Sequence, residues 1–147
     1  MNSALHYELT GRVIGLAMRV HSRLGPGFLE TVYRRALLWE LQRAGIRAEG
    51  EKRIRVLYEG IPVGDFVTDI AVEGKIIVEL KAVARLLQIH EVQTVNYLSA
   101  TGLDIALLLN FGAESLEFQR KYRLPPMHPR RSSSPRPSTP VNPVNPV

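Results

Sequence analysis

The spacing of apolar residues along the chain predicts three helices. Within residues 5–24, apolar side chains recur every three or four positions, which is the pattern of an amphipathic helix. A Gly-Pro-Gly break ends this segment, and a second helix is expected over residues 28–44. A third is expected over residues 89–100. The second helix is apolar around most of its circumference, so it is expected to be largely buried, with Trp39 in the core.

Other stretches have the patterns of strands. Apolar and polar residues alternate within residues 46–58 and again within residues 116–122, as in strands with one exposed face. Residues 66–81 contain two Val/Ile-rich runs on either side of a Glu-Gly pair, which predicts a hairpin. Residues 103–110 are almost continuously apolar, which predicts a central strand covered on both faces. Together these elements predict a single α/β domain with a mixed central β-sheet flanked by α-helices.

The turn of this hairpin decides which charged residues meet. A two-residue loop would place Asp69 and Glu79 on opposite faces of the sheet. A three-residue loop over residues 72–74, with its glycine in the left-handed conformation, pairs Asp69 with Ile77 instead. Asp69, Glu79 and Lys81 then share one face. The longer loop is favoured because it gathers one row on the other face: Phe66, Thr68, Ile70, Val72, Ile76, Val78 and Leu80.

Two carboxylates and a lysine on one face of an apolar sheet need a partner, because charged groups are rarely left unpaired there. One explanation is a hard divalent cation, Mg²⁺ or Mn²⁺, held by Asp69 and Glu79. Lys81 would then orient a water molecule and offset charge that develops on a phosphoryl oxygen. The other explanation is an ion pair between Lys81 and one carboxylate at the end of the sheet. The residue types alone leave both explanations open.

Three motifs in the chain resemble those of a known group of enzymes. Asp69, followed on the next strand by Glu79-Leu80-Lys81, resembles the D…(D/E)-x-K signature of the PD-(D/E)XK nuclease superfamily. Upstream, GFLETVY at residues 27–33 resembles the motif of the GxxExxY proteins, a branch of that superfamily. Downstream, HEVQTVNYL at residues 90–98 resembles the same branch, with the Q-x-x-x-Y pattern of related exonuclease domains. The chain departs from the superfamily at Thr68, where a proline gives the superfamily its name.

The resemblance, which extends from about residue 6 to residue 122, implies a restriction-endonuclease-like fold whose site holds Mg²⁺ or Mn²⁺. Asp69 and Glu79 would be ligands, and Glu30 would add a third, directly or through water. Glu30 and Tyr33 lie three positions apart, so both are expected to point at the hairpin. Without the resemblance, Glu30 is explained as a carboxylate in the first turn of a helix, where the helix dipole favours it.

The resemblance also assigns Lys81 to the attacking water, and Gln93 and Tyr97 to the orientation of water or phosphate. His90, Gln93 and Tyr97 form one polar stripe of their helix, which is also explained as a solvent-facing side. His21, near the end of the first helix, is either a substrate contact or a partner for terminal carbonyl groups of the helix.

The chain has 147 residues, of which 45% are apolar, enough for one domain with a core. It has no cysteine, which excludes disulfides and thiolate zinc sites and suits a reducing cytoplasm. The first residues do not resemble a signal peptide and no apolar run would span a bilayer, so a soluble cytoplasmic protein is expected. Residues 1–123 are predicted to form the domain, and residues 124–147, rich in Pro, Ser and Arg, a disordered tail.

Net charge does not by itself identify a nucleic-acid-binding surface. Of the 19 Lys and Arg residues, four lie after residue 122, where Asp and Glu are absent, so residues 1–122 carry 15 basic and 14 acidic residues. Phosphate binding would then depend on local clusters, such as Arg34 with Arg35, or Lys75, Lys81 and Arg85.

The resemblance and the residues together predict a Mg²⁺-dependent nuclease that hydrolyses phosphodiester bonds in DNA or RNA. The alternative is a non-catalytic nuclease-fold module that binds nucleic acid or a protein. A third hypothesis is a domain that works within a larger complex or a homo-oligomer, since its nearly neutral core has few means of gripping a duplex alone. Sequence reasoning leaves the choice between DNA and RNA, and between endo- and exonuclease action, open.

Overall fold

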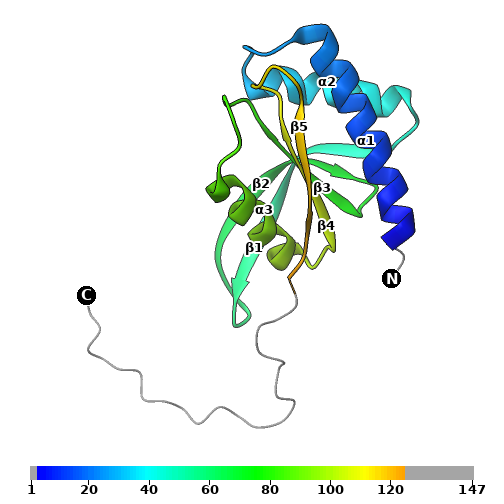
Figure 1. Cartoon of the computed structure of the whole chain (residues 1–147). Coiled ribbons are helices and arrows are strands. Elements are labelled where there is room, and N and C mark those ends of the chain that lie inside the picture. Colours follow the sequence, from blue (N-terminus) through cyan, green and yellow to red (C-terminus); the bar gives the residue numbers. More distant parts are fainter. Residues whose placement is uncertain (1–2, 125–147) are drawn as a thin grey trace.

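The computed structural model describes residues 3–124, which form three helices and five strands (Figure 1). In chain order these are α1 (Ser3–Leu24), α2 (Glu30–Arg43), β1 (Ala48–Tyr58), β2 (Ile61–Val72), β3 (Ile76–Lys81), α3 (Gln88–Thr101), β4 (Ile105–Asn110) and β5 (Glu117–Tyr122). Every helix and strand predicted from the sequence is present. The predicted tail lies, beyond its first residue, outside the described residues, so the domain boundary after residue 123 stays a prediction. Within residues 3–124, no helix has the length and apolar character needed to cross a bilayer.

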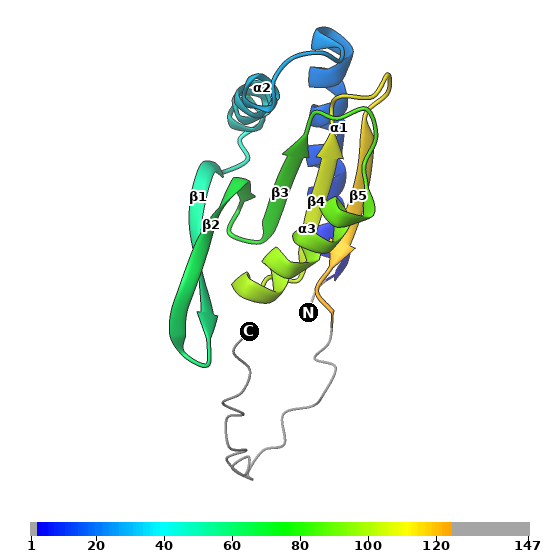
Figure 2. The same ribbon diagram turned by 90° about the vertical axis from the view of Figure 1, so that its left-hand side faces the viewer.

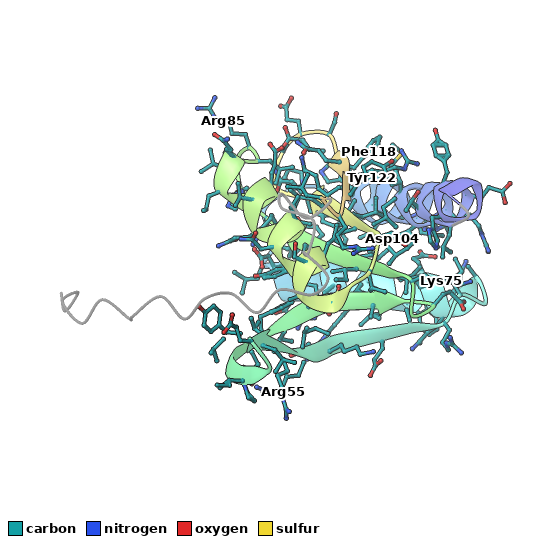
Figure 3. The ribbon with its side chains drawn as sticks, turned by 90° about the horizontal axis from the view of Figure 1, so that it is seen from below. Arg55, Lys75, Arg85, Asp104, Phe118 and Tyr122 are labelled. Atoms are coloured by element: carbon teal, nitrogen blue, oxygen red, sulfur yellow. The ribbon has the colours of Figure 1, made fainter. Side chains whose placement is uncertain are left out.

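The five strands form one mixed sheet in the order β1-β2-β3-β4-β5. β3 and β4 run parallel, since α3 connects them by a crossover, and the other neighbours are antiparallel. The helices α1 and α2 cover one face of the sheet, and α3 covers the other (Figures 2 and 3). This arrangement confirms the predicted α/β fold with a mixed sheet flanked by helices.

The main core lies between the sheet and the helices α1 and α2. The β3 side chains on that face are fully buried: Ile76, Val78 and Leu80. All six residues of β4 are buried, as predicted for a central strand covered on both faces. A smaller core lies under α3, where Ile77 and Leu98 pack with Ala106.

The expectation that α2 is largely buried is wrong. The buried residues of this helix form one stripe: Tyr33, Leu37 and Leu41. Trp39, expected in the core, lies on the opposite side of the helix and is 60% exposed. The reason is that the described elements contact α2 on one side only, where α1 and the sheet lie (Figure 2). Composition thus overstated how much of this helix the fold covers.

The strands β1 and β2 form a long hairpin that is only partly joined to the rest of the sheet. They pair from Ala48 with Val72 to Tyr58 with Ile61. In contrast, β2 pairs with β3 only through residues 70–72. The remainder of the hairpin projects past β3, so the sheet forks between β2 and β3 (Figure 2). Near its turn the hairpin exposes apolar side chains: Leu57, Tyr58, Ile61 and Val63.

The register between β2 and β3 differs by two residues from the expected one. The loop comprises residues 73–75 rather than 72–74, and Asp69 lies across from Glu79 rather than from Ile77. Because side chains alternate with a period of two, this shift does not change which side chains share a face. Asp69 and Glu79 are therefore opposite one another where the two strands separate.

The displaced turn has two physical causes. Val72 is fully buried, and pairing it within the strand keeps it in the core. Glu73 and Gly74 both have positive φ, 53° and 66°, and Lys75 N donates to Val72 O at 2.9 Å, as in a type I′ turn. The Glu73 carboxylate also accepts a hydrogen bond from Arg47 N at 2.8 Å, which offsets the cost of its left-handed backbone. The predicted left-handed conformation of Gly74 is confirmed.

Phe66 and Thr68 do not join the core face, contrary to expectation. Phe66 stacks on Tyr97 of α3, with the ring centroids 4.0 Å apart, and Thr68 lines a hollow beside the same helix. The alternation is interrupted because β2 leaves β3 here, and because Glu51, across from Asp69 on β1, has a positive φ of 52°. The projecting part of the hairpin is thereby turned toward α3.

Candidate active site

Asp69 lies at the fork, directly before the three residues of β2 that pair with β3. Its Oδ2 accepts a hydrogen bond from Leu80 N at 2.8 Å. This bond replaces the backbone carbonyl that the departing strand no longer offers to β3. The side chain of Asp69 therefore satisfies an open edge of the sheet and remains 18% exposed.

Glu79 lies across the fork from Asp69. It is 5% exposed, and its Oε1 has no hydrogen-bond partner among the residues that the structure describes. Burial, together with the charge of Asp69, raises the pKa of Glu79 to about 8, and the Lys81 ammonium opposes part of the rise. A buried carboxylate oxygen without a partner is costly, and a divalent cation would satisfy it. The donor set at the fork thus fits the hypothesis of a metal ion held by both carboxylates.

Lys81 and Tyr97 bring two more polar groups to this face. Lys81 follows Glu79 by two positions on β3, so both side chains leave the strand on the same side. Within residues 3–124, Lys81 takes part in no ion pair at 4.0 Å or less. Burial raises the pKa of Tyr97, and the charges of Glu79 and Asp69 add to the rise, which places its hydroxyl in the field of the carboxylates. The structure therefore groups Asp69, Glu79 and Lys81 at the fork, and the Tyr97 hydroxyl lies near enough for the two carboxylates to act on its pKa.

Arg34 of α2 and Glu51 of β1 complete the surroundings of Asp69. The Arg34 guanidinium donates from Nη1 to Asp69 Oδ1 at 3.5 Å and from Nη2 to Glu51 Oε1 at 3.3 Å. Sequence reasoning identifies Arg34 only as part of a basic cluster, and it misses Glu51. For Arg34, the sequence offers one indication that it lies near the site. It follows the predicted ligand Glu30 by four positions, so both side chains are on one side of the helix.

Glu30 and Gln93 are not joined to the two carboxylates by any hydrogen bond or ion pair within the described residues. Glu30 is the exposed first residue of α2, and Gln93 is exposed on α3, one turn before Tyr97. In the part of the chain that the structure describes, no three His, Asp or Glu side chains gather as a possible metal site. The structure thus groups Asp69 with Glu79, and the third ligand Glu30 stays a prediction.

Tyr33 does not point at the hairpin, contrary to expectation. Its hydroxyl donates to Gly25 O at 2.5 Å and accepts from Phe28 N at 3.1 Å, which holds the loop between α1 and α2. Its ring stacks on Phe111 in the core, with the centroids 4.7 Å apart. Side chains three positions apart on a helix point about 60° apart around its axis. This difference is enough for Tyr33 to be buried in the core while Glu30 stays in solvent.

His21 and His90 each have one ring nitrogen committed to the backbone. His21 Nε2 hydrogen-bonds Ala113 O at 2.8 Å, in the loop between β4 and β5, rather than a carbonyl group at its own helix end. His90 Nδ1 accepts from Leu87 N at 3.1 Å at the start of α3. The first contact ties the end of α1 to the β4–β5 loop, and the second closes the first turn of α3.

The loop that follows Lys81 is held by Asn110, which sequence reasoning missed. Asn110 is fully buried; its Nδ2 donates to Val83 O at 2.9 Å and to Glu117 Oε1 at 2.8 Å, and its Oδ1 accepts from Val83 N at 3.0 Å. Gly112 packs so closely on the same loop that a Cβ there would overlap backbone atoms of Val83. We call this arrangement the Asn110 clamp. It fixes the backbone directly after Lys81.

The stability of the metal-free protein is expected to fall as the pH rises toward the pKa of Glu79. The folded protein keeps a proton on Glu79 up to about pH 8, whereas the unfolded chain releases it near the ordinary value of 4.5. The folded state therefore binds more protons between these values, and its free energy of unfolding falls by up to about 1.4 kcal/mol per pH unit. Urea unfolding in EDTA across this range measures the fall.

The matched control for this experiment is Glu79→Gln, because the amide does not titrate. The stability difference between wild type and variant should follow the slope given above. Parallel curves for the two proteins would show that Glu79 is ionised in the folded state throughout the range.

Comparisons with known proteins bear on the fold and on the family. Residues 7–121 match the PD-(D/E)XK nuclease superfamily. A search of curated proteins found no match. Among solved structures, the crystal structure of SSO0001 matches with a TM-score of 0.52 and 17% sequence identity, over 64% of this chain and 50% of that chain. This likeness shows the fold, and the match spans half the length of that protein. Since the family match covers most of the chain, the protein belongs to the PD-(D/E)XK nuclease superfamily.

Proposed function

We propose that the protein is a nuclease that uses Mg²⁺ or Mn²⁺ to hydrolyse phosphodiester bonds in DNA or RNA. One observation carries the proposal: Glu79 Oε1 is buried beside Asp69 with no hydrogen-bond partner among residues 3–124, and Lys81 leaves the same face of β3. Carboxylate oxygens suit hard divalent cations, which commonly take only one or two carboxylates from the protein. When bound, such an ion polarises a phosphoryl oxygen and makes coordinated water more acidic.

Three residues have the central tasks in this proposal. Asp69 and Glu79 hold the cation, and Glu79 gives up its proton when it does so. Lys81 orients the attacking water and offsets the negative charge that develops on the phosphoryl oxygens. Its freedom from ion pairs in the described structure supports this role, because its ammonium is available to water and substrate.

Three further residues are proposed to act on the phosphate or its water. Tyr97, in the field of the carboxylates, and Gln93, one helical turn before it, orient the phosphate. Glu30, exposed in the first turn of α2, contributes through a water molecule. These roles correspond to the GxxExxY branch of the superfamily, to which we assign the chain as part of the proposal.

A basic hollow between the hairpin and the end of α3 supports a nucleic-acid substrate. It has a volume of about 320 Å³, and its lining includes Lys52, Arg53 and Arg55. Lys52 is paired with Glu49 at 3.8 Å and Arg53 with Asp65 at 2.9 Å. Arg55 projects from the hairpin, away from the body of the sheet (Figure 3). This position would let Arg55 contact the phosphate backbone of a bound strand.

A non-catalytic module that binds a protein partner is the second candidate. The end of the β1–β2 hairpin favours it, because four apolar side chains there are each more than half exposed: Leu57, Tyr58, Ile61 and Val63. Cleavage of nucleic acid separates the two candidates, since a module that only binds a partner leaves nucleic acid intact.

A cleavage assay tests the proposed function. The purified protein, incubated with single- and double-stranded DNA and RNA, should cut at least one of them with Mg²⁺ or Mn²⁺ and none of them in EDTA. The Asp69→Asn variant, purified in the same way, controls for contaminating nucleases. Intact substrates in all four cases, with either metal, would favour the binding module.

A further inference from the structure

The two carboxylate oxygens of Asp69 have different surroundings. Oδ2 accepts the backbone N–H of Leu80 at 2.8 Å, a short bond to β3. Oδ1 is approached by Arg34, whose Nη1 lies 3.5 Å away, at the outer limit of a hydrogen bond. Oδ1 is therefore the oxygen that Asp69 has left for a cation, and Arg34 stands beside it.

Arg34 has a second partner that lies farther out. Its Nη2 is 3.3 Å from Glu51 Oε1, and the Glu51 side chain is 66% exposed, compared with 16% for Arg34. Glu51 occupies this place through an unusual backbone conformation, since it has a φ of 52° within a strand. Such strain in a residue other than glycine tends to occur at functional sites. The guanidinium thus lies between an inner carboxylate at the fork and an outer carboxylate in solvent.

We propose that Arg34 balances the charge of Asp69 in the metal-free protein. Arg34 then competes with a divalent cation for Oδ1 of Asp69, and it moves toward Glu51 when the cation binds. This inference rests on the metal site of the proposed function. Without a cation, Arg34 offsets the negative charge of Asp69. With a cation in place, the guanidinium and the ion are like charges a short distance apart in a partly buried site, where their repulsion is poorly screened. The Arg34–Glu51 pair therefore sets the affinity for metal.

Removal of the competing charge is expected to strengthen metal binding. Arg34→Gln should lower the dissociation constant for Mn²⁺ about tenfold, since it abolishes a repulsion close to the ion. Arg35→Gln is the matched control, because it removes the same charge from the next position of α2, where the side chain is exposed and forms no ion pair within the described residues. That control should change the constant by less than about twofold, since solvent screens the more distant charge.

Removal of the outer partner is expected to have the opposite effect. Glu51→Gln leaves Arg34 with Asp69 alone and should weaken Mn²⁺ binding about fivefold. Glu49→Gln, on the same strand, should change the affinity little, because Glu49 pairs with Lys52 instead. In the Arg34→Gln background, Glu51→Gln should have almost no effect, since its influence acts through the arginine. A carboxylate that attracted the ion directly would act equally with and without Arg34.

Isothermal titration calorimetry of the full chain with Mn²⁺, without nucleic acid, measures these affinities. If the wild type binds no more Mn²⁺ than Asp69→Asn does, the metal site is wrong and the inference fails with it. If the wild type binds Mn²⁺ but Arg34→Gln binds it equally well or more weakly, the inference alone is overturned. Should Arg34→Gln fail to fold by circular dichroism, Arg34→Met, which removes the charge but keeps an apolar chain, takes its place in both comparisons. Equal Mn²⁺ affinities of Glu51→Gln and Glu49→Gln would overturn the inference.

Discussion

Lys81→Ala is expected to lower the rate of phosphodiester cleavage about a thousandfold, while leaving metal binding largely intact. Lys81 lies on the same side of β3 as Glu79, but an ammonium group is no metal ligand. Its loss therefore affects the attacking water and the developing charge. Cleavage rates at saturating Mn²⁺ and the Mn²⁺ dissociation constant measure the two effects separately. Lys75→Ala is the matched control, since that lysine is exposed in the turn before β3.

Asp69→Asn should lose both cleavage and metal binding, because an amide oxygen carries no charge to hold a divalent cation. Its stability without metal should be nearly unchanged, since asparagine can still accept the Leu80 N–H and a neutral amide no longer opposes ionisation of Glu79. A different pair of results would end the nuclease proposal. If no substrate is cut with any metal and Asp69→Asn loses more than about 2 kcal/mol of stability, its contact with Arg34 is a structural ion pair.

Gly112→Ala is expected to destabilise the fold by about 3 kcal/mol. A Cβ at this position would overlap the backbone N and O of Val83 and would lie 2.7 Å from the carbonyl carbon of Ala82. A backbone segment held by the Asn110 clamp cannot move aside as the end of a side chain can. Urea unfolding measures the loss. Cleavage should decrease as well, because the strained loop directly follows Lys81.

Gly15→Ala is the control for this substitution. Gly15 is exposed within α1, and a Cβ there would meet no atom of the described residues within 4 Å. Alanine in an exposed helix interior is favoured over glycine by about 0.5–1 kcal/mol, so this variant should be at least as stable as the wild type. A Gly112→Ala protein of wild-type stability would contradict the rigidity assigned to the Asn110 clamp, because it would show that the loop can move aside for the added methyl group.

Sequence periodicity predicts the elements well because each pattern depends on neighbouring residues. The continuous apolar run of β4 follows from burial on both faces, and all six of its residues are buried. The common face of Asp69, Glu79 and Lys81 follows from the two-residue alternation of strands, which the displaced turn preserves. The position of the turn is predicted one residue too early, because it depends on how deeply the tertiary structure buries Val72.

The features that sequence reasoning missed depend on contacts between distant residues. Arg34 meets Asp69 across 35 positions, and Asn110 meets Val83 across 27. No spacing rule relates such pairs. Trp39 was expected in the core for a similar reason: composition shows how apolar a helix is, but not on how many sides other elements cover it.

Because the sheet forks between β2 and β3, most of the β1–β2 hairpin is joined to the body of the sheet only through residues 70–72. The hairpin carries Asp69, whereas the body of the sheet carries Glu79, so a rotation about residues 70–72 changes the distance between the two carboxylates. Phe66, stacked on Tyr97 at 4.0 Å, braces the hairpin against α3. The exposed apolar end of the hairpin lies beyond this brace and far from the pivot (Figure 2). A partner bound at this end, as in the second candidate function, would therefore act on the spacing of the proposed metal ligands from a distance.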